Sequence, residues 1–427
     1  MFARVFSMPR YQVIPTAAHP TTLVGTCRAR RCSLLILTRS SNSSAVTVET
    51  SGRDDHSSGS PQPSTTLKPE HVQEQEPAVA STATSSTSVQ SQKAADHALP
   101  DSDPEERRKL WIKAIKPPMY SVGFMPVLVA AAVVYTEYGL LPWLRCSGLV
   151  LASICIIAWL NLSNDAFDAA TGVDKTKRES VVNLTGNRNL VLLVANVFLL
   201  AGVGLLLTLV TANGDMRPVM MLTAAIACGY VYQGPPFRLS YKGMGEPLCF
   251  VAFGPLALPA FYLAQLPAQP VAAAATAVVP PLVWLLAGLV GLTTTIILFC
   301  SHFHQIEGDK AAGKMSPLVR LGTEKAVKVL RVATGAPFLG VVAAVVLGLI
   351  LGANPTVSHG SGAVVAPWTL MPALLLSVPA AMSLLSFAET NHTVPAAIAP
   401  LKIFATKLHI AFGMTLISGL ALSRCFV

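Results

Sequence analysis

The chain has 427 residues, of which 52% are hydrophobic and 12% charged, and its formal net charge is +9. So few charged residues exclude an ordinary soluble protein and indicate a polytopic membrane protein. The positive charge bears on membrane orientation and anionic partners, because no basic patch interleaved with aromatic residues favours nucleic acid. The eight cysteines form no CxxC pair, so we expect neither a disulfide framework nor a zinc site.

The first 103 residues differ in composition from the apolar remainder. Residues 1–48 contain six arginines, frequent Ser and Thr, and no acidic residue before Glu49, which is typical of an organelle transit peptide. Residues 49–103 are rich in Ser, Thr, Gln, Pro and Glu, and they cannot bury enough apolar surface to become ordered. We therefore expect a transit peptide at 1–48 and a disordered linker at 49–103. Composition alone does not separate mitochondrion from plastid.

Residues 104–427 are predicted to form one all-α membrane domain. A charged segment at 105–116, with Trp111 and Ile112, is typical of an interfacial helix. Nine apolar runs then follow, each long enough to cross a bilayer core of about 30 Å: 118–136, 143–163, 190–211, 218–235, 246–266, 281–302, 326–352, 367–387 and 403–424. Pro255 and Pro259 predict a kink in the fifth run. The sequence thus predicts nine transmembrane helices that enclose a central cavity.

Basic residues are distributed unequally between the two sides of this predicted bundle. The amino-terminal flank and the loops after the second, fourth, sixth and eighth runs carry most of them, whereas the opposite side carries Arg145, Arg217 and Arg424. Such an asymmetry fixes the orientation of a membrane protein. The polar loops described next are therefore expected on one face, the stromal or cytosolic equivalent, together with the amino-terminal flank.

The second apolar run ends in a polar segment, residues 159–188, with the sequence WLNLSNDAFDAATGVDKTKRESVVNLTGNR. Asp165 and Asp168 are three residues apart and would share one helix face, where two carboxylates require a compensating cation. With Asn164 and Asp174 they offer the oxygen ligands that Mg²⁺ prefers alongside substrate phosphates. Basic residues suited to phosphate follow: Lys175, Lys177, Arg178 and Arg188. The alternative is a solvated loop.

Two further polar segments, residues 230–246 and 301–325, are predicted on the same face. Residues 230–246 read YVYQGPPFRLSYKGMGE, where Arg238 and Lys242 flank Tyr241, and Gly243 and Gly245 would let backbone approach a ligand closely. Contact with substrate and a snorkelling basic loop are equally compatible with this pattern.

The sixth run ends in SHFHQIEGDKAAGKMSPLVRLGTEK, residues 301–325. Glu307 and Asp309 can supply a second set of oxygen ligands, and Lys314 and Arg320 can contact phosphate oxygens. His302 and His304 are interpreted as a polar helix end, because oxygen-rich surroundings do not favour zinc.

Together these segments resemble the UbiA superfamily of membrane prenyltransferases, and most closely its plant and algal 1,4-dihydroxy-2-naphthoate phytyltransferase branch. NDAFDAATGVD is similar to that family's NDxxDxxxD motif, with a longer gap before the last Asp. Its second motif is usually DxxxD; when Gly313 and Lys314 are aligned, Asp309 takes the final position and Gln305 the first. The resemblance covers roughly residues 107–427.

The resemblance implies transfer of a phytyl group from its diphosphate to dihydroxynaphthoate, with decarboxylation, in phylloquinone or menaquinone biosynthesis. It implies Mg²⁺ held by carboxylates, with cationic and polar residues on the diphosphate, in a chloroplast membrane. The implied metal ligands are Asp165, Asp168, Asp174, Glu307 and Asp309, and the implied catalytic residues are Asp165, Asp168, Asp309 and Lys242. The implied substrate-binding residues are Asn164, Lys175, Lys177, Arg188, Arg238, Tyr241, Gln305, Lys314 and Arg320.

Gln305 leaves the second ligand set open. Glu307 and Asp309 differ by about 200° on a regular helix. Either the backbone unwinds around Gly308, or Asp309 binds alone with waters completing the octahedron. We favour Asp309 as the direct ligand, with Glu307 acting through water or a lysine.

Two other functions remain open at this point. One is a homogentisate or 4-hydroxybenzoate prenyltransferase of the tocopherol or ubiquinone pathway. The other is a secondary transporter, which usually places ionisable residues near the membrane midplane, often within an internal repeat. Here the acidic residues lie at helix ends and on one side.

Overall fold

The computed structural model describes residues 103–172, 178–211, 214–267, 277–350 and 367–426. The chain divides into two units, Met1–Ser81 and Thr82–Val427, and the described residues all belong to the second unit. The predicted transit peptide, 1–48, and the linker up to residue 102 lie outside the described residues. So do Asp174, Lys175 and Lys177 of the first acidic segment.

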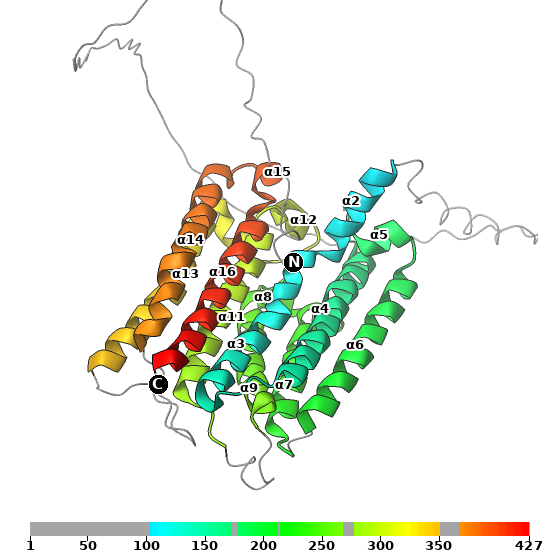
Figure 1. The fold of residues 1–427 in the computed structure, drawn as a ribbon. Coiled ribbons are helices and arrows are strands. Elements are labelled where there is room, and N and C mark those ends of the chain that lie inside the picture. Colours follow the sequence, from blue (N-terminus) through cyan, green and yellow to red (C-terminus); the bar gives the residue numbers. More distant parts are fainter. Residues whose placement is uncertain (1–102, 173–177, 212–213, 268–276, 351–366, 427) are drawn as a thin grey trace, which may run out of the picture. The chain divides into compact units, whose positions relative to one another are not determined.

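The described part of the chain is helical and contains no strand, as predicted (Figure 1). Its longer helices are α2 (Pro104–Ile115), α3 (Ser121–Tyr138), α4 (Trp143–Thr171), α6 (Arg188–Val210), α7 (Arg217–Gln233), α8 (Gly245–Val251), α9 (Ala257–Gln265), α11 (Pro281–Ser301), α13 (Pro317–Ile350), α14 (Met371–Asn391) and α16 (Leu401–Ser423). The short elements are η1 (Pro117–Tyr120), α5 (Val181–Thr185), η3 (Leu239–Lys242), η4 (Ala252–Leu256), α12 (Ile306–Ala311), η5 (Pro367–Leu370), α15 (Pro395–Ile398) and η6 (Arg424–Phe426).

Each of the nine predicted apolar runs forms a helix or a chain of helices. Within the described residues, eight are long and apolar enough to cross a membrane. The remaining run, predicted at 218–235, forms α7, which has 17 residues and is shorter than the roughly 20 residues that span a bilayer core. The structure is therefore that of a polytopic membrane protein, with a span count close to the predicted nine.

The fifth predicted run crosses as α8, η4 and α9 in one continuous stretch, Gly245–Gln265. Pro255 lies inside η4, which is a π-helical segment. Proline lacks a backbone N–H and clashes with the preceding turn, and a widened turn accommodates it. At Gly254 a Cβ atom would lie 2.6 Å from the carbonyl oxygen of Ala287 on α11. The glycine thus allows this irregular helix to pack directly on α11.

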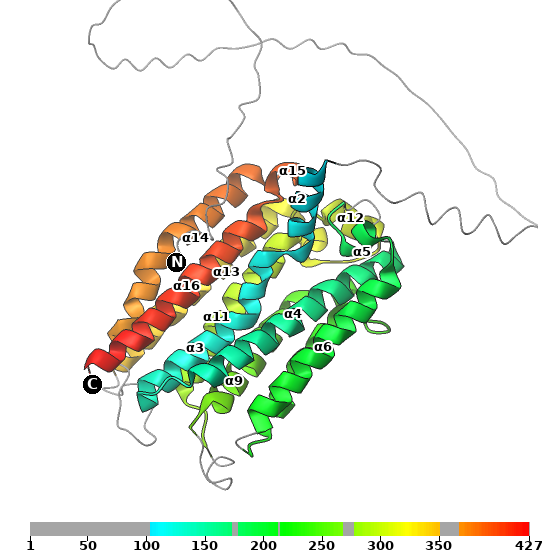
Figure 2. The same cartoon turned by 45° about the vertical axis from the view of Figure 1, so that its right-hand side comes forward.

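The helices pack around α3 and α11 in the interior of the domain. α3 contacts α4, α9 and α16, while α11 contacts α8, α13 and α16. In Figures 1 and 2, α4 and α6 run side by side, as do α14 and α16.

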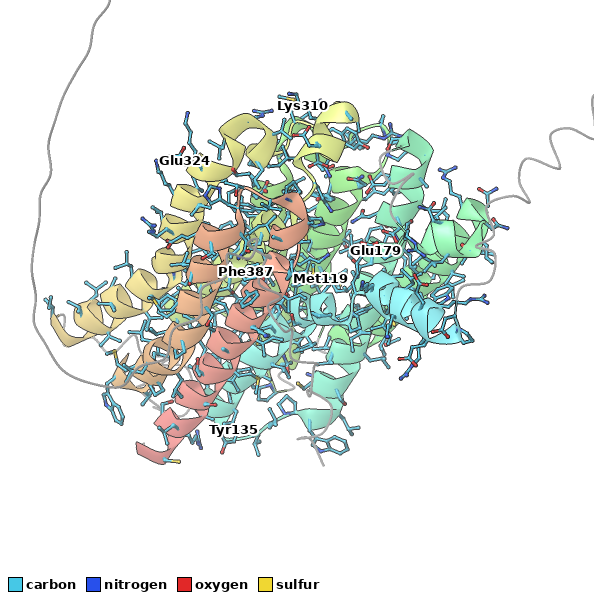
Figure 3. All side chains as sticks on the ribbon, turned by 90° about the horizontal axis from the view of Figure 1, so that it is seen from above. Met119, Tyr135, Glu179, Lys310, Glu324 and Phe387 are labelled. Atoms are coloured by element: carbon cyan, nitrogen blue, oxygen red, sulfur yellow. The ribbon has the colours of Figure 1, made fainter. Side chains whose placement is uncertain are left out.

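The polar segments gather at one end of the bundle. Figure 1 places α2, α5, α12 and α15 at this end, and the chain's carboxyl terminus lies at the other. The first acidic segment precedes α5 and the second forms α12, so both share one face, as the charge asymmetry predicted. Figure 3 views the bundle from this end, with Met119 near the middle of the view and Lys310 and Glu324 towards its edge.

Candidate active site

The first acidic segment is the end of a membrane helix and not a loop. α4 continues past the predicted end at 163 to Thr171, and Gly172 then stops it in the left-handed conformation (φ 77°), with its N–H bonded to the Asp168 carbonyl. The Ala-rich sequence favours helix, and glycine adopts the terminating conformation without strain. Asp165 and Asp168 therefore lie in the last turns of α4, on a helix as predicted.

Asp165 is buried and already carries a cationic partner. Its side chain is 3% exposed, and its Oδ1 lies 2.9 Å from Nζ of Lys116. Its Oδ2 accepts a hydrogen bond from the N–H of Val181 at 3.1 Å. Lys116 ends α2 with φ 54°, a left-handed conformation that is uncommon for a residue with a side chain. Such conformations persist where the surrounding structure requires them, often at functional sites.

Asp168 is half-buried and contacts the end of α7. Its Oδ1 accepts a short hydrogen bond from Nε2 of Gln233, a buried side chain at the last position of α7. The other amide atom of Gln233, Oε1, accepts from the Ser240 hydroxyl at 2.7 Å. A chain of hydrogen bonds thus connects α4, through one glutamine, to η3, the single 3₁₀ turn in the loop between α7 and α8, which is called the loop Leu239–Lys242 below.

This loop also contacts the second acidic segment. The Tyr241 hydroxyl lies 2.7 Å from the Thr171 hydroxyl at the end of α4, while its carbonyl accepts from the N–H of Met315 at 2.9 Å. Burial, reinforced by the nearby Asp168 charge, raises the pKa of Tyr241. Gly243 (φ 76°) makes this approach possible, since a Cβ there would lie 2.8 Å from the Met315 carbonyl oxygen. The close contact we expected with a ligand is thus made here with protein backbone.

The second acidic segment folds as a short helix and a tight turn. α12 carries Asp309 on its buried side, and Gly313 (φ 71°) then reverses the chain. The reversal brings Nζ of Lys314 to 3.4 Å from Oδ1 of Asp309, and both side chains are buried. Oδ2 of Asp309 is buried and, among the described residues, has no hydrogen-bond partner. A buried oxygen of this kind is a candidate metal ligand.

Glu307 and Gln305 are placed differently from Asp309. α12 is continuous through Gly308, so the unwinding considered from the sequence does not occur. Glu307 is exposed, whereas Asp309, two positions on, is buried. Gln305 precedes the first residue of α12, and its side chain makes no capping hydrogen bond. The structure therefore brings Asp309 towards the site and turns Glu307 towards solvent.

The predicted phosphate-binding cations divide into two groups. Arg320 donates to the carbonyls of Lys242 (2.8 Å) and Met315 (3.2 Å), and Arg188 donates to the Ala166 carbonyl (2.9 Å). These two arginines therefore hold the backbone of the site in place. Lys242 is exposed at the loop, and Arg238 is half-buried with a buried Nε that has no partner among the described residues. Lys242 and Arg238, with Lys314, remain placed to meet an anion.

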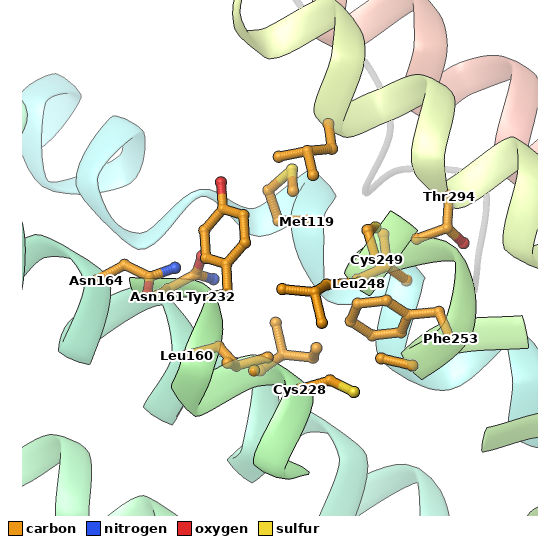
Figure 4. A pocket seen from close by; sticks show the side chains of 15 residues that line it. Met119, Leu160, Asn161, Asn164, Cys228, Tyr232, Leu248, Cys249, Phe253 and Thr294 are labelled. Carbon is orange, nitrogen blue, oxygen red and sulfur yellow. The ribbon is translucent and has the colours of Figure 1, made fainter. Parts of the chain in front are cut away.

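An apolar cavity lies below this polar end. It measures about 140 Å³, and in Figure 4 Asn161, Asn164 and Tyr232 lie on one side of it and Phe253 and Thr294 on the other. A second cavity of about 60 Å³ continues deeper, from Gly123 on α3 to Phe261 on α9. The two share four lining residues, Ile157, Leu160, Ala252 and Phe253. The two cavities therefore adjoin each other along α4.

Sequence reasoning did not identify Lys116, Gln233 or Asn161 as site residues. Lys116 precedes a Pro-Pro pair, and Gln233 is a polar residue at the end of an apolar run, which are weak signals. Asn161 precedes Asn164 by one helical turn, and its spacing could have extended the polar face of α4.

A model of the UbiA prenyltransferase family matches residues 124–405. The chain belongs to the UbiA prenyltransferase family. Two relatives in this family resemble it over most of their length: the 2-carboxy-1,4-naphthoquinone phytyltransferase of Synechocystis sp. is 42% identical over 73% of this chain and 93% of its own. The chloroplastic enzyme of the same name from Arabidopsis thaliana is 44% identical over 74% of this chain and 78% of its own.

More distant members of the UbiA prenyltransferase family also match. The 1,4-dihydroxy-2-naphthoate octaprenyltransferase of Escherichia coli is 24% identical over 51% of this chain and 70% of its own. Among solved structures, a UbiA homolog from Archaeoglobus fulgidus bound to GPP and Mg²⁺ is 18% identical, with a TM-score of 0.46, over 72% of this chain and 99% of that one.

Proposed function

We propose that this UbiA family member transfers a phytyl group from phytyl diphosphate to 1,4-dihydroxy-2-naphthoate, with loss of the ring carboxylate as CO₂. One observation supports this proposal: hydrogen bonds through the loop Leu239–Lys242 join the two acidic segments, and an apolar cavity lies below them. The names of the relatives from Synechocystis and Arabidopsis support the phytyl donor and the carboxylated naphthalene ring. The carbonyl of Tyr241 and the amide of Gln233 are the contacts that hold the two halves together.

The carboxylate oxygens of the site suit a divalent metal ion that prefers hard oxygen ligands. Asp168 and Asp309 offer carboxylate oxygens, and Oδ2 of Asp309 is buried without a partner among the described residues. The described part of the chain holds no group of three or more His, Cys, Asp or Glu that could bind a metal alone. Mg²⁺ commonly takes only one or two carboxylates and completes its shell with phosphates and water. The carboxylates that would share Mg²⁺ with the diphosphate, one or two to an ion, are Asp165 and Asp168 at the end of α4 and Asp309 on α12.

The reaction needs negative charge to be stabilised on the leaving diphosphate. When bound, Mg²⁺ would neutralise this charge as it develops. Arg238, Lys242 and Lys314 would donate hydrogen bonds to the remaining phosphate oxygens. The C–O bond of the donor breaks, and its electron pair leaves with the diphosphate.

The allylic cation that remains must be kept from water. The apolar cavity below the diphosphate end would hold the cation and exclude water. Tyr232 and Phe253 line that cavity. Their ring faces can stabilise a cation by about 0.5–2 kcal/mol each. Tyr230 and Phe237, two further aromatic residues of the segment 230–246, are exposed. The cavity that continues along α4 would hold the rest of the phytyl chain.

The acceptor supplies the electron pair that the cation needs. A ring carbon that bears the carboxylate attacks the cation with its π electrons, and the new carbon–carbon bond forms. The bond to the carboxylate then breaks, CO₂ leaves, and its electrons restore the aromatic ring. Both hydroxyl protons stay on the product, a phytylated naphthoquinol, so no external oxidant or base is consumed.

An acceptor panel tests this function directly. Membranes that contain the full chain, phytyl diphosphate and Mg²⁺ are supplied with dihydroxynaphthoate, homogentisate or 4-hydroxybenzoate, and products are identified by mass. We expect phytylation of the naphthoate and loss of its carboxylate. Phytylation of homogentisate or 4-hydroxybenzoate alone would instead assign the tocopherol or ubiquinone pathway.

We also propose that the protein resides in a chloroplast membrane. The support is the basic, acid-poor composition of residues 1–48 and the chloroplastic relative in Arabidopsis. A fluorescent fusion of residues 1–103 should enter plastids. Its accumulation in mitochondria would contradict this location.

A further inference from the structure

A buried amide on the wall of the larger cavity has no role in the chemistry above. Asn161 lies on α4 and lines this cavity beside Asn164 and Tyr232 (Figure 4). The Tyr120 side chain interacts with that of Asn161, but no acceptor meets Nδ2 of Asn161 in hydrogen-bond geometry among the described residues, and this nitrogen is buried. A buried donor without an acceptor is destabilising and needs an explanation.

The position of Asn161 extends the polar face of α4 down to the cavity. Asp165 and Asp168 lie four and seven residues further along the same helix, so the three side chains share one face. With a rise of 1.5 Å per residue, Asn161 lies about 6 Å from Asp165 along the helix axis. The amide is therefore one helical turn below the carboxylates, on the wall of the space that would hold the allylic cation.

Other polar groups on this wall differ from the amide of Asn161. The Thr294 hydroxyl donates to the Val290 carbonyl of its own helix at 2.8 Å, which uses its only donor. Cys228 and Cys249 also line the cavity, but their thiols are weak hydrogen-bond donors. Asn161 combines a strong donor, burial of that donor and a place on the cavity wall.

The occupant of the cavity must supply an oxygen for this donor. A phytyl chain is a hydrocarbon and accepts no hydrogen bond, so the chain alone would leave the amide unsatisfied. The acceptor ring carries three polar groups. Its carboxylate leaves as CO₂, and the hydroxyl at position 1 can donate to that neighbouring carboxylate within the molecule. The oxygen at position 4 has no such internal partner, and it is the ring oxygen farther from the reacting carbon.

We propose that Nδ2 of Asn161 donates a hydrogen bond to the ring oxygen at position 4 of the acceptor and thereby makes the site specific for a ring oxygenated at both positions. This inference rests on the proposed function and deepens it by naming a residue that recognises the acceptor. A hydroxyl oxygen and a quinone carbonyl oxygen both accept from an N–H, so the contact is independent of the oxidation state of the ring. The carboxynaphthoquinone and the dihydroxynaphthoate for which the relatives are named both carry this oxygen.

The contact should act on binding of the acceptor more than on the chemical step. The oxygen at position 1 is bonded next to the reacting carbon and feeds electron density to it, whereas the oxygen at position 4 is not placed to do so. An analogue without the oxygen at position 4 would leave Nδ2 of Asn161 unsatisfied again. The net contribution of one such hydrogen bond corresponds to about tenfold in affinity.

The test compares two acceptors that differ in this oxygen alone. Membranes with the full chain receive phytyl diphosphate, Mg²⁺ and either 1,4-dihydroxy-2-naphthoate or 1-hydroxy-2-naphthoate under anaerobic reducing conditions. We expect the wild type to favour the dihydroxy acceptor in kcat/KM by about tenfold or more. In Asn161→Leu this ratio should fall by about tenfold, through a higher KM for the dihydroxy acceptor, while KM for phytyl diphosphate stays the same. If the analogue is not turned over, its inhibition constant against the dihydroxy acceptor replaces its kcat/KM.

A matched control and a second measurement separate recognition from folding. Asn196 of α6 is exposed and lines neither cavity, so Asn196→Leu should leave the acceptor ratio unchanged. The second measurement is the thermal unfolding midpoint without substrates. Leucine has the same branching as asparagine and removes the unsatisfied donor, so the midpoint of Asn161→Leu should equal or exceed that of the wild type.

Each outcome decides the matter. A wild type that uses both acceptors equally well, or an acceptor ratio in Asn161→Leu equal to that in Asn196→Leu, overturns the inference while leaving phytyl transfer intact. A clear fall in the midpoint of Asn161→Leu also overturns it, because the amide would then be bonded within the protein. A wild type that phytylates neither naphthalene acceptor contradicts the proposed function itself, and the inference with it.

Discussion

The backbone N–H of Met315 donates to the carbonyl oxygen of Tyr241 at 2.9 Å, and this bond joins two halves of the site that are far apart in the sequence. Arg320 reinforces the junction, because its guanidinium donates to the carbonyls of Lys242 and Met315 on either side of it. Backbone contacts of this kind position the acidic segments regardless of which ligand is bound. The loop Leu239–Lys242 is therefore a scaffold of the site and also carries one of its cations.

Gln233 is expected to matter although it is neither acid nor base. Gln233→Leu removes the donor to Asp168 and the acceptor for Ser240, so the carboxylate loses its orientation. Residues that orient metal ligands typically contribute about 10- to 100-fold in metal affinity or activity. We expect a loss of that size, seen as a higher Mg²⁺ concentration for half-maximal activity. Ser240→Ala removes only the outer bond and should cost less; equal losses in the two variants would contradict this role.

Lys116 is expected to stabilise the site before metal binds. In Lys116→Met the buried Asp165 keeps the N–H of Val181 but loses its cation. Breaking a buried ion pair costs about 3 kcal/mol or more. The thermal unfolding midpoint without Mg²⁺ should fall, and Mg²⁺ with diphosphate should restore it more than in the wild type.

The matched control for Lys116 is Lys109→Met, which breaks the exposed pair with Glu105. Exposed pairs contribute little, so its midpoint should hardly change. If both lysine variants unfolded at the wild-type temperature, Lys116 would not be the counter-charge of Asp165.

The deeper cavity is expected to hold the distal part of the phytyl chain. Ala225 of α7 lines it, whereas the neighbouring Ala224 is exposed and does not line it. Ala225→Phe should lower kcat/KM for phytyl diphosphate by about tenfold through overpacking and spare the shorter geranyl diphosphate. Ala224→Phe should affect neither donor. If Ala225→Phe lowered kcat/KM equally for phytyl and geranyl diphosphate, the phytyl chain would have to lie elsewhere.

The local part of this site could be predicted from the sequence. The spacing of Asp165 and Asp168 predicted one helix face, and the charge asymmetry predicted that α12 and the end of α4 share one side of the membrane. Both hold in the structure, because helical periodicity and the cost of burying charge act over short stretches of chain.

The contacts that complete the site could not be predicted in the same way. Lys116 meets Asp165 across 49 positions and Gln233 meets Asp168 across 65. These pairings depend on how α2 and α7 pack against α4, and periodicity does not specify that packing. The extension of α4 to Thr171 was also missed, because apolarity was used to end the run at 163 although the polar turn keeps helix-forming residues.

Substitution of Asp309 and Glu307 tests most directly whether α12 completes the diphosphate site. Asp309→Asn and Glu307→Gln each remove one carboxylate charge with little change in shape, but Asp309 is buried and Glu307 is exposed. In Mg²⁺-dependent phytyl transfer, we expect Asp309→Asn to lose activity by about a thousandfold, while Glu307→Gln stays near the wild type and Gln305→Asp is tolerated. If Glu307→Gln abolished transfer and Asp309→Asn were mild, the assignment of the site to the buried face of α12 would be wrong.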